Sequence, residues 1–147
     1  MIKLVNDTIS REDLLDLSAW LLQEPAPQLT KGALTVQFQE KWAAEIGTKY
    51  STFVNSGSSA ILLALSALQQ GNYLRNNKVV VSGLSWHTDV SSPILLGYDV
   101  ILSDCNTKDL SCDLEDLESI FKADKPSVLI LVSVLGLVPD MDRVVEL

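Results

Sequence analysis

The sequence NSGSS at positions 55–59 has the composition of a turn that binds an anion. It follows the apolar run Ser51 to Val54 and precedes the apolar stretch Ser58 to Gln70, which predicts a strand, a tight turn and a helix in that order. The first turn of a helix leaves about four backbone N–H groups without intrahelical partners and carries the positive end of the helix dipole. A phosphate group is a suitable ligand for such a turn.

Three residues of the turn are the candidate phosphate ligands. Gly57 allows close approach of a ligand to the backbone, while Ser58 and Ser59 offer hydroxyl groups beside their amides. The alternative is that Ser56 or Ser58 only caps the helix, because serine is a common residue at helix starts.

A tryptophan is expected at the same edge of the molecule. Trp86 follows the apolar strand Lys78 to Val81 by a few residues, and its ring could stack on a flat cofactor. The alternative is that Trp86 packs between a helix and the sheet. The neighbouring His87 reads as a surface or loop residue in preference to a catalytic base.

Composition excludes several classes of protein. The 147 residues are 47% hydrophobic, which is typical of a folded domain with a sizeable core and excludes a disordered tail. The net charge of -8 argues against a nucleic acid partner, since phosphate backbones are bound by clustered Lys and Arg. No apolar run reaches the roughly 20 residues that span a bilayer, so no membrane segment is expected.

The two cysteines, Cys105 and Cys112, are too few for a zinc site with the single histidine. Their spacing is compatible with a disulfide, but the N-terminal residues do not resemble a secretion signal. We therefore expect reduced thiols and a cytoplasmic protein.

The apolar pattern predicts helices that alternate with short strands. Two helices come first, Ser10 to Leu22, with Ser10 and Asp13 as caps, and Thr35 to Ile46, which ends at Gly47. The remaining expected elements are strand Ser51 to Val54, helix Ser58 to Gln70, strand Lys78 to Val81, helix Trp86 to Leu96, strand Val100 to Ser103, helix Asp113 to Lys122, strand Val128 to Val132 and a helix from about Met141.

Strands that are apolar throughout and alternate with helices predict an α/β fold. We expect three layers, with a mainly parallel sheet covered by helices on both faces. Ligands of such sheets bind beyond the carboxyl ends of the strands, so the loops Asn55 to Ser58, Ser82 to Trp86 and Ser133 to Gly136 should line one mouth.

Several segments resemble the DegT/StrS-type sugar aminotransferases, which are pyridoxal-phosphate enzymes of the aspartate aminotransferase superfamily. The similar segments read LTKG, FQEKW, FVNSGSSAILLALSAL, VVVSGLSWHTDVSSPILLG, SDCNTKDLSCDLEDLE and LILVSVLGLVPDMD, in the family's order. The resemblance implies that Ser58 and Ser59 hold the phosphate of pyridoxal 5'-phosphate, that Gly57 gives the cofactor access to the backbone, and that Trp86 stacks on its ring. It also implies a segment at 1–34 that precedes the large α/β domain, of which 35–147 is the N-terminal part.

The chain departs from the family near the expected substrate pocket. Ser82 replaces a common proline, while Ser133 and Leu135 stand where many relatives have histidine and tyrosine. The resemblance places the Schiff-base residue and the acid that pairs with the pyridinium nitrogen beyond Leu147. We therefore expect the chain to be a fragment with no catalytic residue of its own and to be inactive alone.

By resemblance, the intact enzyme transfers an amino group from glutamate to a nucleotide-linked keto sugar for polysaccharide biosynthesis and forms a homodimer. One alternative is a sugar 3-dehydrase of the same family, in which histidine replaces the Schiff-base lysine. Another is a remnant without catalysis that binds a phosphate ligand or a partner subunit.

Overall fold

The structure, a computed structural model, describes residues 8–147. The first seven residues, which begin the expected segment 1–34, lie outside the described residues. The chain divides into two compact units, Met1–Phe53 and Val54–Leu147. The domain boundary expected after residue 34 concerns the complete enzyme and stays a prediction.

The first unit contains two helices, α1 (Arg11–Leu21) and α2 (Ala33–Glu45). The expected capping of α1 is confirmed, because the Asp13 amide donates to Ser10 Oγ at 3.1 Å and the Ser10 amide donates to Asp13 Oδ2 at 2.7 Å. Gly47 follows α2 with a φ of 72°, a left-handed conformation that suits glycine and ends the helix.

The prediction of a strand at Ser51 to Val54 is wrong, because the structure has no strand there. A strand needs a neighbouring strand to satisfy its backbone, and none of the described strands pairs with this segment. Residues of the segment bind α2 instead: Ser51 Oγ donates to the Gln39 carbonyl at 2.6 Å, and the Phe53 amide donates to Gln39 Oε1 at 3.0 Å. The Phe53 ring also packs edge-on against Phe38, with 5.4 Å between ring centroids.

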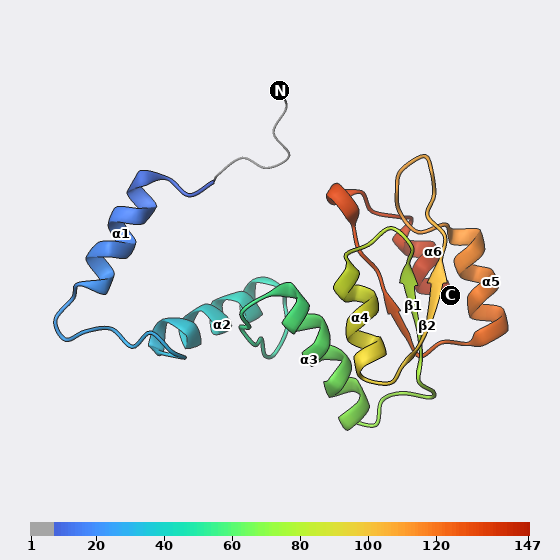
Figure 1. The fold of residues 1–147 in the computed structure, drawn as a ribbon, viewed down its shortest axis with the longest axis horizontal. Coiled ribbons are helices and arrows are strands. Elements are labelled where there is room, and N and C mark those ends of the chain that lie inside the picture. The colour runs from blue at the N-terminus through green and yellow to red at the C-terminus, as the bar shows by residue number, and fades with distance from the viewer. Residues whose placement is uncertain (1–7) are drawn as a thin grey trace. The chain divides into compact units, whose positions relative to one another are not determined.

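The second unit is the α/β part of the chain (Figure 1). Its three strands are parallel and lie in the order β2-β1-β3. In chain order its elements are α3 (Gly57–Gln70), β1 (Lys78–Ser82), α4 (His87–Leu95), β2 (Asp99–Ser103), α5 (Leu114–Asp124), β3 (Val128–Ile130), the short 3-10 helix η1 (Val134–Gly136) and α6 (Met141–Glu146). The strands at β1, β2 and β3 confirm the sequence prediction, although β3 ends two residues earlier than expected.

The central strand β1 supplies the core on both faces of the sheet. Val79 and Val81 pack with Leu65 of α3 and with Tyr98, whereas Val80 packs on the other face with Leu117 of α5. Successive side chains of a strand point to opposite faces, so three consecutive valines serve two cores. All three are completely buried, and the predicted three-layer arrangement is confirmed.

Side chains close the amino edge of the sheet. Ser127 Oγ accepts the amides of Arg75 and Asn76 at 3.0 and 2.9 Å, and Asn76 Oδ1 accepts the Lys78 amide at 3.0 Å. Lys78 Nζ forms an ion pair with Asp124 Oδ1 at 2.8 Å. These contacts fasten the start of β1 to the turn that joins α5 to β3.

Candidate functional site

The first turns of α3 and α4 lie together at the carboxyl edge of the sheet. Helix α4 follows the carboxyl end of β1 after a four-residue loop, and Ser58 Oγ of α3 donates a hydrogen bond to Thr88 Oγ1 of α4 at 3.1 Å. Figure 1 shows the starts of α3 and α4 at the same edge of the sheet. Because Trp86 is the residue that precedes α4, the 55–59 turn and Trp86 lie at one edge, as the sequence predicts.

The start of α3 leaves two backbone donors open. Ser56 caps the helix, because the amide of Ser59 donates to Ser56 Oγ at 3.1 Å and the amide of Ala60 donates to the Ser56 carbonyl at 3.0 Å. The amides of Gly57 and Ser58 make no hydrogen bond to any described residue. Capping and anion binding are thus compatible here, with the Ser59 amide used by the cap.

The hydroxyl groups of this turn are also arranged as donors. Ser56 Oγ donates to Ser59 Oγ at 3.1 Å, so the Ser59 hydroxyl hydrogen is available to a further acceptor. A β-carbon added to Gly57 would meet no heavy atom of the surrounding residues within 4 Å, so the protein leaves open space beside the α-carbon of this residue.

Trp86 occupies the cap position of α4 and its side chain is 65% exposed. The alternative that this ring is packed between helix and sheet is wrong. The ring lies beside the exposed His87 imidazole, with 5.1 Å between ring centroids and 45° between the planes. His87 is accordingly a surface residue, as the sequence indicates.

Two residues that the sequence interpretation missed hold this arrangement in place. Asp89 is 2% exposed, and its Oδ2 accepts the Trp86 amide at 3.0 Å while its own amide donates to the Trp86 carbonyl at 2.9 Å. Thr88 accepts the bond from Ser58. The spacing of Trp86 and Asp89, that of a helix cap and its third residue, is a signal that could have identified Asp89.

Hollows border the start of α3. One of about 340 Å³ lies between α3 and α4, and one of about 470 Å³ lies beside the turn that precedes α3. Both include Ser59 and Leu62 in their walls. Of the candidate cofactor residues, Ser58 and Ser59 therefore border open volume.

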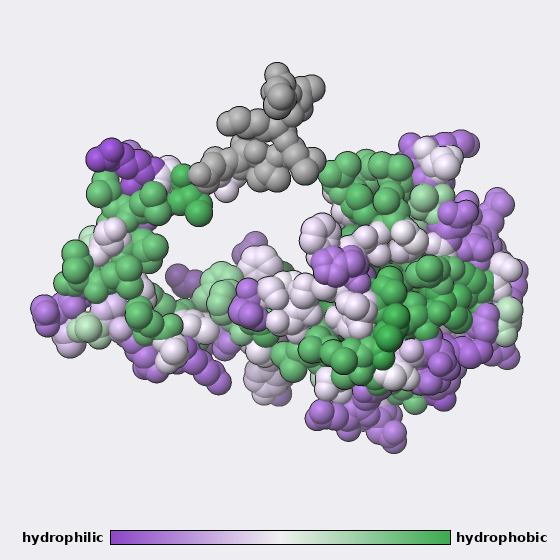
Figure 2. All heavy atoms as spheres, in the orientation of Figure 1, coloured by the Kyte–Doolittle hydropathy of each residue, from purple (hydrophilic) through white to green (hydrophobic). Residues whose placement is uncertain are grey.

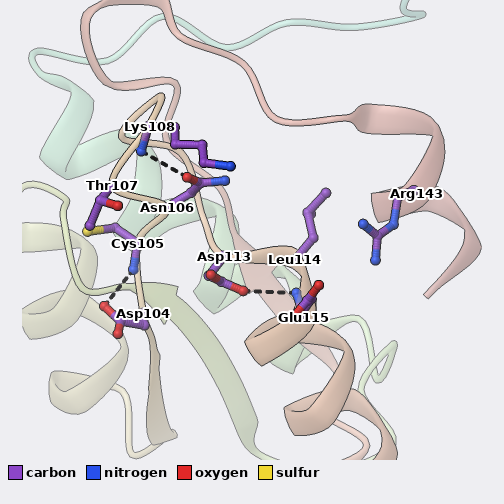
Figure 3. A pocket seen from close by; sticks show the side chains of 9 residues that line it. All are labelled: Asp104, Cys105, Asn106, Thr107, Lys108, Asp113, Leu114, Glu115 and Arg143. Carbon is purple, nitrogen blue, oxygen red and sulfur yellow. Dashed lines mark hydrogen bonds between the residues drawn. The ribbon is translucent and has the colours of Figure 1, made fainter.

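Another cavity, of about 480 Å³, lies where β2 ends and α5 begins (Figure 3). Its walls carry the carboxylates of Asp104, Asp113 and Glu115 together with the cations of Lys108 and Arg143. Asp113 Oδ1 is already used as the cap of α5, accepting the amides of Glu115 and Asp116. Among the described residues, no three His, Cys, Asp or Glu side chains are grouped so that they could hold a metal ion. We place the candidate cofactor site at α3 and α4, where donors are open.

Comparison with known proteins defines the class of enzyme. The family model of the DegT/DnrJ/EryC1/StrS aminotransferases matches residues 11–147, and the chain belongs to this family. The resemblance seen in the sequence is thereby confirmed.

Individual relatives are enzymes of nucleotide-sugar metabolism. The chain is 31% identical over 121 residues to a GDP-4-keto-6-deoxy-D-mannose 3-dehydratase of Yersinia pseudotuberculosis, an alignment that covers 80% of this chain and 30% of the relative. It is 26% identical over 115 residues to a GDP-perosamine synthase of Caulobacter vibrioides, covering 78% and 30%. The chain thus spans about a third of the length of the curated relatives that it matches.

Solved structures confirm the fold. The aminotransferase PseC of Helicobacter pylori superimposes with a TM-score of 0.77 at 20% identity, over 94% of this chain and 36% of that protein. A ColD 3-dehydratase variant with bound GDP-perosamine gives a TM-score of 0.76 at 23% identity, over 97% and 37%. In the part of the chain that the structure describes, no helix combines the length and apolarity needed to cross a membrane.

Proposed function

We propose that this chain is the N-terminal, cofactor-binding part of a pyridoxal 5'-phosphate enzyme that transfers an amino group from glutamate to a nucleotide-linked keto sugar. The observation that carries the proposal is the pair of open amides at Gly57 and Ser58, at the same sheet edge as the exposed Trp86 indole, in a member of an aminotransferase family.

The residues present fit the two halves of this cofactor. The amides of Gly57 and Ser58, with the Ser59 hydroxyl, can donate hydrogen bonds to a phosphate at the positive end of α3. The Trp86 ring offers a flat apolar surface to a pyridine ring. Pyridoxal phosphate supplies an electron sink for reactions at the carbon that carries the amine. The described residues bind and orient it, whereas the chemistry needs other groups.

We infer that the Schiff-base residue and the acid for the pyridinium nitrogen are supplied by sequence beyond Leu147. Of the lysines in the described part of the chain, Lys78 lies at the amino end of β1 and is paired with Asp124 at 2.8 Å. The amino end of a parallel strand is the edge opposite the candidate site. Lys31 and Lys49 fall at loop positions, which the resemblance does not use for catalysis.

A second reaction is supported by the curated relatives. The Yersinia pseudotuberculosis relative is a 3-dehydratase, so removal of a sugar hydroxyl is the alternative to amination. The residue that separates the two reactions in this family, lysine or histidine at the Schiff-base position, is the one placed beyond Leu147. Incubating the intact enzyme with nucleotide-linked keto sugar and glutamate distinguishes them, since one yields an amino sugar and the other a deoxygenated sugar.

The proposed setting is a cytoplasmic homodimer with neither nucleic acid nor membrane as a partner. Apolar side chains of α1 lie at the surface (Figure 2), and Leu14, Leu15 and Leu17 are each half exposed or more. Exposed apolar surface of this kind favours association with further protein. A remnant that only binds a phosphate ligand or a partner subunit is the remaining alternative.

Equilibrium dialysis of pyridoxal 5'-phosphate against the purified chain tests the proposed cofactor site. Gly57→Ala adds a methyl group that meets no surrounding protein atom, so the fold should be kept. The methyl group hinders close approach of a ligand to this backbone, and affinity should fall about tenfold or more. Trp86→Ala should also weaken binding, and Trp86→Phe should restore much of it. Tyr73→Ala is the matched control, because Tyr73 is 77% exposed and follows the C-terminal end of α3, and this variant should bind as the wild type does.

Equal affinity of the wild type and Gly57→Ala would contradict the proposed phosphate site. Borohydride treatment of the mixture tests the placement of the Schiff-base residue. We expect no single lysine of this chain to be modified selectively, and a stable adduct at one lysine would refute that placement.

A further inference from the structure

The two cysteines face each other across a short antiparallel bridge. The bridge joins Cys105, just after β2, to Cys112, just before α5. The flanking hydrogen bonds run from the Asn106 amide to the Ser111 carbonyl at 2.7 Å and from the Asp113 amide to the Asp104 carbonyl at 2.9 Å. This pattern makes the cysteines a non-hydrogen-bonded pair, in which opposite side chains are closest and Cα atoms are about 4.5 Å apart. Disulfides form at Cα separations of about 4.4–6.8 Å.

The loop between the cysteines is held in this form by its own hydrogen bonds. The Leu110 amide donates to the Asn106 carbonyl at 2.8 Å, and Leu110 has a left-handed φ of 62° that closes the turn. Asp109 Oδ1 accepts both the amide and the hydroxyl of Ser111, at 3.0 and 2.7 Å. The loop therefore presents the two cysteines to each other without a rearrangement of the backbone.

The two thiols differ in access to solvent. Cys105 is half-buried and lies in the wall of the cavity at the end of β2 (Figure 3). Cys112 is 2% exposed and packs with Val80 and Leu117, and this burial raises the pKa of its thiol. Cys105 is thus the thiol that an external reagent reaches first, and Cys112 is the one placed to react with it afterwards.

We propose that Cys105 and Cys112 form a reversible dithiol–disulfide site that reacts with small disulfides such as oxidised glutathione. The Cys105 thiolate attacks one sulfur of the reagent, a mixed disulfide forms, and the first reagent thiolate leaves and takes up a proton. The Cys112 thiol then loses its proton, attacks the Cys105 sulfur and releases the second reagent thiol. Overall, two protein thiols are oxidised while one small disulfide is reduced to two thiols.

The disulfide would connect the end of β2 covalently to the start of α5. The carbonyl of Ser103, the last residue of β2, accepts a hydrogen bond from the Gly83 amide at 2.7 Å. Gly83 lies in the segment that leads to Trp86. Oxidation would therefore fix the loop beside the carboxyl edge of the sheet.

Equilibration of the 147-residue chain in buffers of increasing glutathione disulfide-to-thiol ratio tests the proposal, with quenching by N-ethylmaleimide and peptide mass spectrometry. We expect wild-type protein to lose both reactive thiols in one transition and to yield a peptide cross-linked between Cys105 and Cys112. Cys112→Ala should accumulate one glutathione on Cys105, because no second thiol can displace it. Cys105→Ser should react more slowly than Cys112→Ala, since the remaining thiol is buried.

Three outcomes would overturn the proposal: persistent single-glutathione adducts in the wild type, disulfides only between separate chains, or both thiols still free in the most oxidising buffer. Peptide mass spectrometry of the wild-type protein alone detects each of these three outcomes, even if a variant does not fold. Circular dichroism of each variant shows whether its result can be compared with the wild type.

Discussion

Replacement of Leu117 by alanine should destabilise the second compact unit strongly. Leu117 is completely buried and joins α5 to the sheet through its contact with Val80 and Cys112. Truncation of a buried leucine to alanine costs about 2–5 kcal/mol, through lost burial and the cavity left behind. Domains are stable by only about 5–15 kcal/mol, so the change removes a large share of the total.

Urea denaturation followed by circular dichroism measures this effect. With a slope of about 2 kcal/mol per molar urea, a loss of about 3 kcal/mol lowers the midpoint by about 1.5 M. Leu95→Ala is the matched control, because Leu95 also lies on a helix but is 76% exposed, and surface substitutions usually change stability by less than about 0.5 kcal/mol. Equal midpoints for the two variants would refute the assignment of Leu117 to the core.

Two further predictions concern hydrogen bonds and titration. Tyr98→Phe should lower the free energy of unfolding by about 1 kcal/mol, because the buried hydroxyl donates to the Leu65 carbonyl at 2.8 Å. Burial also raises the pKa of Tyr98. The stabilisation by the neutral Tyr98 hydroxyl is therefore complete below the ordinary tyrosine pKa of about 10 and is lost as pH rises through the pKa of the folded state. Absence of an upward shift of the Tyr98 pKa in an ultraviolet titration would contradict this. Hydrogen bonds from Ser111 lower the pKa of Asp109, so the stabilisation is present above the unfolded pKa of about 3.9 and is lost as pH falls through the folded value. Ser111→Ala should raise the pKa of Asp109 in a carboxyl NMR titration, and an unchanged value would show that Ser111 is not the cause.

The parallel sheet could be predicted from sequence because its signals are local. Each of its strands is an apolar run bounded by polar residues, and the valines at 79–81 serve both faces of the sheet. Helix starts could also be predicted to within two residues, and Ser10 caps α1 through its side chain as expected.

The expected strand at Ser51 to Val54 failed for a reason that sequence patterns do not contain. An apolar extended run becomes a strand only beside a partner, and here Gln39 and Phe38 of α2 satisfy it in another way. The bridge between Cys105 and Cys112 was missed similarly, because pairing across a loop depends on the left-handed turn at Leu110.

The separate residues of the candidate site could be predicted from the sequence, but the contacts between them could not. The turn at Gly57 and the ring of Trp86 follow from strand ends and helix polarity. The bond from Ser58 to Thr88 joins residues on different helices, and the use of the Ser59 amide by Ser56 depends on the exact start of α3. Such contacts require the three-dimensional arrangement.

The side-chain contacts at the amino edge of the sheet give the second unit an uneven resistance to local opening. Ser127, Asn76 and Lys78 hold that edge through bonds to backbone and to Asp124, while the opposite edge ends in loops. Backbone amides near Lys78 should therefore exchange with deuterated solvent more slowly than those near Leu84 and Ser133. The contacts at the amino edge thus keep the strands in register independently of the loops that carry the candidate site.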